Sequence, residues 1–281
     1  MTEPVLVARD ALAGLNVGVS VSDSADLSRL GLRPSHCALA VVEIARAILL
    51  AGGRIVYGGD LRAGGFAALL VNEVRSYADG RRALTICLPR TAHEAMTDEE
   101  LALADRRLGT AGRLIVMAPD GRAVPPGQRS PAAGPLDAPA ALTDLRRHLT
   151  AVTAARIIVG GALTGHQGDA PGVVEEALMS VQARQPLYAA GGFGGAALAI
   201  ARALGRDPAA WAPPGVPQGA DAPPAAAALN ALETAFHDLG GADDGLGVAQ
   251  RHQLAATHRP GEIAALAALG LARAPLAGAN T

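Results

Sequence analysis

The sequence predicts an α/β protein built on a Rossmann-like open parallel sheet flanked by helices, followed by a helical C-terminal extension rich in alanine and proline. Three observations support this fold class. Short apolar runs typical of buried strands alternate with helical segments along most of the 281 residues. Glycine-rich loops follow several of these strands, as in sheets that bind ligands at their carboxyl edge. Half of the residues are hydrophobic but only 2% are aromatic, so small aliphatic side chains must form the core.

The first part of the chain predicts four strands separated by helices. Runs rich in β-branched residues indicate strands at 15–21, 54–57, 84–88 and 113–117. Amphipathic segments indicate helices at 35–51, 66–77 and 97–105. Ser35 is expected to cap the first helix, and Thr97 to form a capping box with Glu100 at the third. Residues 118–139 carry many prolines and glycines, which predicts an irregular surface insertion.

From residue 142 onward, predicted helices and strands alternate again, and after residue 205 only helical patterns remain. A helix is predicted at 142–153, a strand at 156–160, a helix opening near Pro171, and a strand at 186–190. We therefore assign residues 1–205 to one Rossmann-like domain. Residues 206–281 show helical patterns around 225–239 and 262–271 with no strand between them, so we expect an extension packed on the core or on a partner.

Charge and cysteine content exclude several classes of protein. The formal net charge is −2 and the pI about 6.4, which argues against duplex nucleic acid as a partner. Two cysteines, Cys37 and Cys87, provide neither a disulfide framework nor paired zinc-ligand spacing, and we expect no metal and no cofactor. The most apolar run, 38–51, is interrupted by charges, and the first residues lack the apolar segment of a signal peptide. We expect a cytoplasmic protein that does not associate with membranes.

Glycine-rich turns at 58–65, 160–172 and 191–195 each follow a predicted strand. Glycine lets backbone amides approach a phosphate closely, and the start of a helix adds a favourable dipole. Polar side chains in these loops, and in the loop after the first strand, are candidates for contacts with ribose or phosphate. The predicted ligand-binding residues are Ser22, Asp23, Gly58, Gly59, Asp60, Arg62, Gly64, Gly65, Gly160, Gly161, His166, Gly172, Glu175, Gly191, Gly192, Phe193 and Gly194.

Two adjacent acids open the helix near Pro171, and two adjacent arginines lie on the helix before it. Consecutive helix positions point about 100° apart, so at most one of Glu175 and Glu176 should face a ligand. A carboxylate near the anomeric carbon of a nucleotide would be needed to cleave its glycosidic bond. One of Glu175 and Glu176, together with Arg146 or Arg147, is therefore a candidate for this chemistry. The alternative is an arginine–glutamate pair that stabilises helix packing.

Two segments, RIVYGGDLRAGGF and IIVGG followed by PGVVEEAL and QPLYAAGGFGG, resemble the SLOG superfamily. They are most similar to bacterial relatives of the TRPM-channel amino-terminal domain, and also resemble the lonely-guy, lysine-decarboxylase-like phosphoribohydrolases. The resemblance covers roughly residues 15–205 without the proline-rich insertion. Tyr57, Gly58 and Gly59 stand at the YGGG loop of those hydrolases.

The second hydrolase motif, PGGxGTxxE, matches only at its end. The resemblance places Glu176 on the catalytic acid and Arg146 or Arg147 near the functional arginine of the family. Val173 stands where the hydrolases have a threonine that contacts phosphate, and Gly160 and Gly161 are separated from Pro171 by an added loop.

The resemblance implies a protein that binds a nucleotide or an NAD-derived, ADP-ribose-type ligand as a signalling or defence-linked sensor. It also implies a homodimer or higher homo-oligomer and a separate effector protein as partner. One alternative is a nucleoside 5′-monophosphate N-glycosidase, that is, a phosphoribohydrolase-like hydrolase. A second alternative is an assembly module without a ligand.

Overall fold

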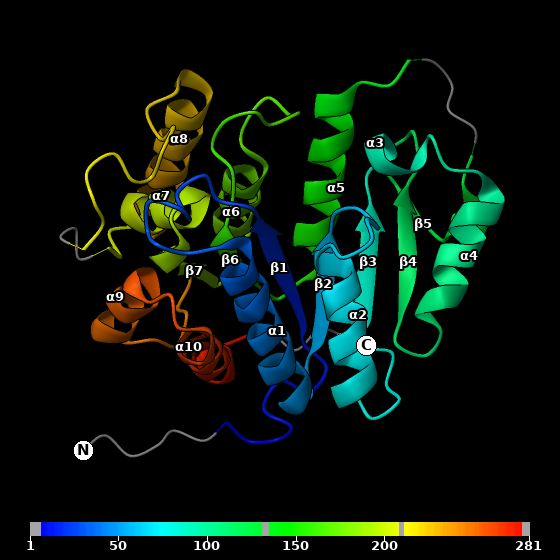
Figure 1. Cartoon of the computed structure of the whole chain (residues 1–281), viewed down its shortest axis with the longest axis horizontal. Helices are drawn as coiled ribbons and strands as arrows, with labels where there is room; N and C mark the ends of the chain where they lie inside the picture. The colour runs from blue at the N-terminus through cyan, green and yellow to red at the C-terminus, as the bar shows by residue number, and fades with distance from the viewer. Residues whose placement is uncertain (1–6, 131–134, 208–210, 277–281) are drawn as a thin grey trace.

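Seven strands form a single, mostly parallel sheet, which confirms the predicted fold class (Figure 1). The computed structural model describes residues 7–130, 135–207 and 211–276. The strands run in the order β5-β4-β3-β2-β1-β6-β7, and β5 is antiparallel to β4. Their bounds are β1 (Asn16–Ser22), β2 (Arg54–Gly58), β3 (Leu84–Leu88), β4 (Gly112–Met117), β5 (Ala123–Val124), β6 (Ala155–Gly160) and β7 (Leu187–Ala190).

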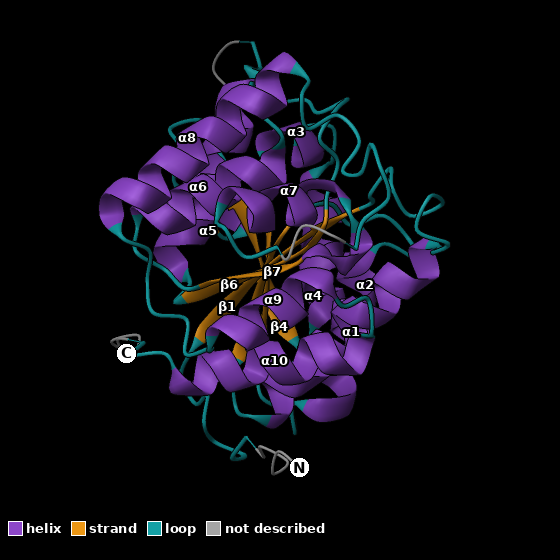
Figure 2. Cartoon of the chain, turned by 90° about the vertical axis from the view of Figure 1, so that its left-hand side faces the viewer, coloured by secondary structure: helices purple, strands orange, loops and turns teal. Residues whose placement is uncertain are grey.

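Helices cover both faces of this sheet, as the edge-on view in Figure 2 shows. On one face lie α1, α2, α4, α9 and α10, and on the other α5, α6, α7 and α8. No helix within the described ranges combines the length and the apolar character that crossing a membrane requires. The helices are α1 (Pro34–Leu50), α2 (Phe66–Tyr77), α3 (Arg90–His93), α4 (Asp98–Leu108), α5 (Ala138–Val152), α6 (Gly172–Gln182), α7 (Gly195–Ala203), α8 (Pro223–Leu239), α9 (Val248–Ala256) and α10 (Pro260–Arg273).

The strand order reverses at β1. The chain moves outward from β1 through β2, β3 and β4, and then returns to β6 on the other side of β1. Val19 in β1 is in register with Tyr57 in β2 and with Ile157 in β6. Ligands of open parallel sheets bind outside the carboxyl ends of the strands at such a reversal. Ser22 and Gly160, which end β1 and β6 side by side, therefore mark the expected crevice.

Side-chain patterning explains why these segments form helices and strands. In α1, buried Cys37, Val41, Ile44 and Ile48 recur at helical spacing and pack on the sheet. Every residue of β6 is buried, because helices cover the sheet on both sides of it.

Two helix starts test the predicted caps. The capping box at α4 is confirmed, because the Glu100 amide donates to Thr97 Oγ1 at 3.1 Å and the Thr97 amide donates to Glu100 at 2.7 Å. The Ser35 cap is wrong, because α1 already begins at Pro34 and the Arg33 amide donates to His36 Nδ1 at 3.0 Å. Proline suits the first helical position, since its φ angle is already helical and no amide partner is needed there.

The segment predicted to be irregular, 118–139, contains β5, the 3₁₀ helix Pro126–Gln128 and the start of α5, while residues 131–134 lie outside the described ranges. The two-residue β5 and the four-residue α3 are too short to show a periodic pattern, so the sequence did not predict them. The helix α9 was missed as well, because most of its side chains are polar or small.

The C-terminal helices pack directly on the sheet domain. Helix α10 lies against α1, α8 against α6 and α7, and α9 against β7. Buried Asp244 forms ion pairs with Arg206 at 3.1 Å and with Arg251 at 2.9 Å. The Tyr188 hydroxyl of β7 donates to the Asp244 carbonyl at 2.9 Å. Charged and apolar contacts thus hold the extension to the core, while a domain boundary at residue 205 stays a prediction.

Candidate functional site

The loops after β1 and β6 are joined at the expected crevice. The Gly161 amide donates to the Ser22 carbonyl at 2.8 Å, and the Ala162 amide lies 3.3 Å from Ser22 Oγ. Gly160 and Gly161 have φ angles of 61° and 99°, which favour glycine. A Cβ at Gly161 would lie 2.8 Å from Ala196 Cβ. Ser22 therefore fixes the β6–α6 loop, and Asp23 next to it is exposed.

The predicted glycine loop after β7 is filled by the protein itself. Gly191 to Gly194 are buried, and a Cβ on Gly191 or Gly192 would overlap the carbonyls of Ala255 or Thr257. Asp26, fully buried, accepts the Gly195 amide at 2.7 Å and the Gln218 amide at 2.9 Å. A carboxylate of the chain thus occupies the start of α7, the position that a ligand phosphate takes in related folds. Of the three predicted glycine loops, the one after β7 is thus occupied by the backbone near Ala255 and Thr257 and by the Asp26 carboxylate.

The loop between β2 and α2 follows the strand next to β1 at the same carboxyl edge of the sheet, where it would form one rim of the expected crevice. Asp60 accepts the Arg62 amide at 3.0 Å and pairs with the Arg62 guanidinium at 2.7 Å. A Cβ on Gly59 would lie 2.5 Å from the Tyr57 hydroxyl, so this glycine makes room for the phenol. Burial raises the pKa of Tyr57, and the nearby Asp60 and Glu176 carboxylates add to the increase. Tyr57 is therefore a neutral hydroxyl buried beneath the rim.

The glycines of the same loop differ in their surroundings. A Cβ on Gly58 would overlap Leu149, so helix α5 packs closely on the end of β2. Gly64 has a φ angle of 74° and open space around it, whereas Gly65 precedes α2 as its N-cap. Among the predicted loop glycines, Gly64 is thus exposed and Gly58 serves packing.

The two predicted arginines point in different directions. Arg146 is buried, donates to Glu175 and lies beneath the loop before α6, where a Cβ on Gly172 would be 2.5 Å from its Nη2 atom. Glu175 also accepts the Thr143 hydroxyl at 2.6 Å. Arg147 is 66% exposed and pairs with Asp144 on the outer surface. The structure thus brings Arg146, but not Arg147, to the start of α6.

Glu176 belongs to a separate buried network. Its Oε2 atom accepts Arg156 Nη1 at 2.7 Å and also the Ser20 hydroxyl. Arg156 is 1% exposed and further donates to Ser180 at 2.8 Å and to Thr150 at 3.2 Å. Burial lowers the pKa of Arg156, and the Glu176 carboxylate opposes this change. The network connects β1, β6, α5 and α6 between the sheet and the helices that cover it.

Sequence reasoning missed the role of Arg156 and Ser20. A single arginine inside an otherwise apolar strand was the available signal, since a charge that is buried needs a partner. The partner is Glu176, 20 residues later in the chain. Helix periodicity does not identify it, because the pair forms between a strand and a helix.

The loop before α6 contributes two more predicted residues. His166 Nδ1 donates to the Gly168 carbonyl at 2.8 Å and so stabilises the turn. Val173, which replaces a threonine of the hydrolases, is 8% exposed and packs on the β6–α6 loop, 3.2 Å from the position of a Cβ on Gly161. In the described residues, no group of three or more His, Cys, Asp or Glu side chains is placed to hold a metal ion.

A family model described as SLOG cluster2 matches residues 11–218. The chain belongs to this SLOG family. The match includes every strand of the sheet and ends before α8, so the SLOG region comprises all the loops at the crevice. SLOG domains often bind nucleotide-derived ligands. No curated protein and no solved structure matches the chain.

Proposed function

We propose that this SLOG protein binds an NAD-derived, ADP-ribose-type ligand at the carboxyl ends of β1, β2 and β6 and does not cleave it. The observation that carries the proposal is the pairing of Glu176 with the fully buried Arg156. A glycosidase acid near a developing oxocarbenium ion must offer it negative charge. Here the Arg156 guanidinium already balances that charge, which favours binding over hydrolysis.

The start of α6 is suited to the phosphates of such a ligand. No side chain caps this helix, and the amides of Gly172 and Val173 have no acceptor among the described residues. The helix dipole and free amides favour an anion at this position. The Arg146 guanidinium lies beside Gly172, although its pair with Glu175 offsets part of its charge.

The rim of the crevice is suited to sugar hydroxyls. Ionised carboxylates accept hydrogen bonds from hydroxyl groups but repel phosphate. Asp23 is exposed after β1, and Asp60 lies after β2, held by Arg62. A ligand with its ribose near β2 and its phosphates at α6 would satisfy both ends of the crevice.

Neighbouring arginines provide a matched test. Isothermal titration with ADP-ribose, cyclic ADP-ribose, NAD and nucleoside monophosphates should show binding of at least one ADP-ribose-type compound. Arg146→Gln should weaken binding about tenfold or more, because a charged hydrogen-bond donor near the phosphates is lost. Arg147→Gln, which changes an exposed residue outside the crevice, should leave affinity unchanged. Absence of heat at millimolar ligand, or equal losses in both variants, would overturn the proposal.

A second candidate is N-glycosidase activity on nucleoside 5′-monophosphates. One feature favours this activity. Glu176 Oε1 has no hydrogen-bond partner among the described residues, so this carboxylate oxygen is free to contact a substrate. Chromatography of incubated nucleotides separates the two functions: a sensor releases no free base, whereas a hydrolase releases base and loses several orders of magnitude in turnover in Glu176→Gln. Light scattering on the same sample tests the proposed homodimer or higher homo-oligomer. If the protein is a sensor, a separate effector protein is its proposed partner.

A further inference from the structure

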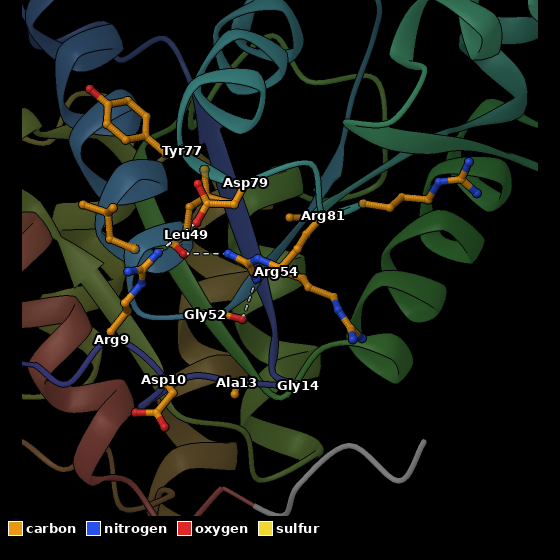
Figure 3. Close-up of a pocket in the computed structure, with 13 residues that line it drawn as sticks. Arg9, Asp10, Ala13, Gly14, Leu49, Gly52, Arg54, Tyr77, Asp79 and Arg81 are labelled. Carbon is orange, nitrogen blue, oxygen red and sulfur yellow. Dashed lines mark hydrogen bonds and ion pairs between the residues drawn. The ribbon is translucent and has the colours of Figure 1, made fainter.

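A cavity of about 1050 Å³ lies at the opposite edge of the sheet from the crevice (Figure 3). Arg54 at the start of β2 and the turn before β3 form part of its wall. The amino-terminal segment around Arg9 and the end of α1 form the rest. Because this cavity is at the amino ends of the strands, it is separate from the crevice at their carboxyl ends.

The cavity is positively charged although the protein is not. Four arginines and two aspartates line it, a formal charge of +2, whereas the whole chain has a formal charge of −2. The Arg9 guanidinium pairs with Asp79 at 3.0 Å, and both side chains are exposed. Local positive charge in a concave site attracts anionic ligands.

Arg81 prepares the cavity for an anion. Its guanidinium donates to the Leu49 carbonyl at 2.9 Å and to the Gly52 carbonyl at 3.0 Å, as Figure 3 shows. These carbonyls lie at the carboxyl end of α1, which carries the negative end of the helix dipole. The Arg81 guanidinium therefore offsets the partial negative charge of these carbonyl oxygens, which would otherwise repel an anion.

Two further arginines are available for contacts with a ligand. Among the described residues, the side chains of Arg54 and Arg82 form no hydrogen bond or ion pair. Both side chains are exposed on the cavity wall. Their guanidinium groups therefore offer positive charge and hydrogen-bond donors that have no partner among the described residues.

The cavity also has an apolar wall. Tyr77 and the exposed Leu50 line it, and the Arg46 guanidinium lies 4.8 Å from the centre of the Tyr77 ring. Aromatic side chains are rare in this chain, at 2% of residues. A cavity lined by an aromatic ring and by several arginines suits a ligand that carries both a planar group and phosphates.

We propose that this cavity is a second ligand site, which takes a small molecule bearing a diphosphate. The site uses none of the residues of the crevice, so it does not depend on the proposed function. Arg54 and Arg82 bind the diphosphate, and Tyr77 contacts the organic part.

The test is isothermal titration of the full chain with pyrophosphate, ADP and adenosine at 0.15 M salt, where screening suppresses long-range attraction. Pyrophosphate and ADP should bind, ADP more tightly, and adenosine should not. The double variant Arg54→Gln/Arg82→Gln should bind both anions at least about tenfold more weakly, since each lost charged hydrogen bond has a substantial effect.

Arg122→Gln/Arg147→Gln is the matched control, because it removes the same charge from exposed residues elsewhere. Unchanged affinity in this control supports the site. Three results would overturn it: no binding of pyrophosphate or ADP at millimolar concentration, equal losses in both double variants, or loss in Arg146→Gln with retention in Arg54→Gln/Arg82→Gln. The last result would assign the anion to the crevice and leave the proposed function standing.

Discussion

At the residue scale, the Arg156–Glu176 pair is the feature on which both stability and chemistry depend. Removing one partner of a buried ion pair leaves an uncompensated charge, which costs about 3–5 kcal/mol. Arg156→Met should therefore lower the free energy of unfolding by about that amount in denaturant titrations. The double variant Arg156→Met/Glu176→Met removes both charges and should recover most of the loss. A double variant no more stable than the single one would show that the two residues act independently.

The buried His93 should make the stability of the folded protein depend on pH. Its imidazole is buried, Nε2 donates to the Met117 carbonyl at 2.9 Å, and Nδ1 has no partner in the described structure. Burial lowers the pKa of His93, although the Met117 carbonyl opposes the change. The unfolded chain thus binds this proton more readily, so its contribution to stability is present above pH 6.5, about the ordinary pKa of histidine, and is lost as the pH falls below it.

Thermal melts from pH 7.5 to pH 5 measure this contribution. The decrease in melting temperature should be smaller in His93→Gln, which retains a donor for Met117 but does not titrate. His237→Gln is the control, because that side chain is 89% exposed. A decrease of the same size in all three proteins would exclude His93 as the cause.

At the scale of elements, the β7–α7 loop shows that a glycine-rich turn can serve packing. Gly191 and Gly192 have no Cβ, and this absence lets the end of α9 and the residue that follows it approach the loop backbone. Gly192→Ala should therefore destabilise the protein by about 1–3 kcal/mol, the usual cost of overpacking. Gly261→Ala, on α10 with open space around it, should have little effect. Equal melting temperatures for both variants would contradict this role of the loop.

At the scale of the whole molecule, the C-terminal helices and the sheet should unfold together. Asp244 is fully buried and pairs with Arg206 and Arg251, so the joint between core and extension is itself part of the interior. Asp244→Asn leaves two arginines without a counter-charge and should remove about 3–5 kcal/mol of stability in a single transition. Asp243→Asn changes a neighbour outside this triad and should melt near the wild-type temperature. Two separate transitions in the wild-type protein would contradict a shared unfolding unit.

The sequence by itself determined the fold class, the six parallel strands and the SLOG family. Alternation of apolar runs and helical patterns is local information, and the motifs around Gly58 and Gly172 are contiguous in the chain. The capping box at Thr97 could be predicted for the same reason. The two-residue β5 and the single helical turn of α3 could not be predicted, because so few positions show no periodic pattern.

Only the tertiary structure decided what the polar residues and glycines face. It separated Arg146 from Arg147, joined Glu176 to Arg156, and filled the loop of Gly191 and Gly192 with the C-terminal segment. Each of these contacts joins elements that are distant in sequence or lie on different layers. The same glycine-rich sequence is compatible with the close approach of a phosphate and with the close approach of the protein's own backbone. The physical reason is that burial and charge pairing depend on the packed neighbours, which local sequence does not specify.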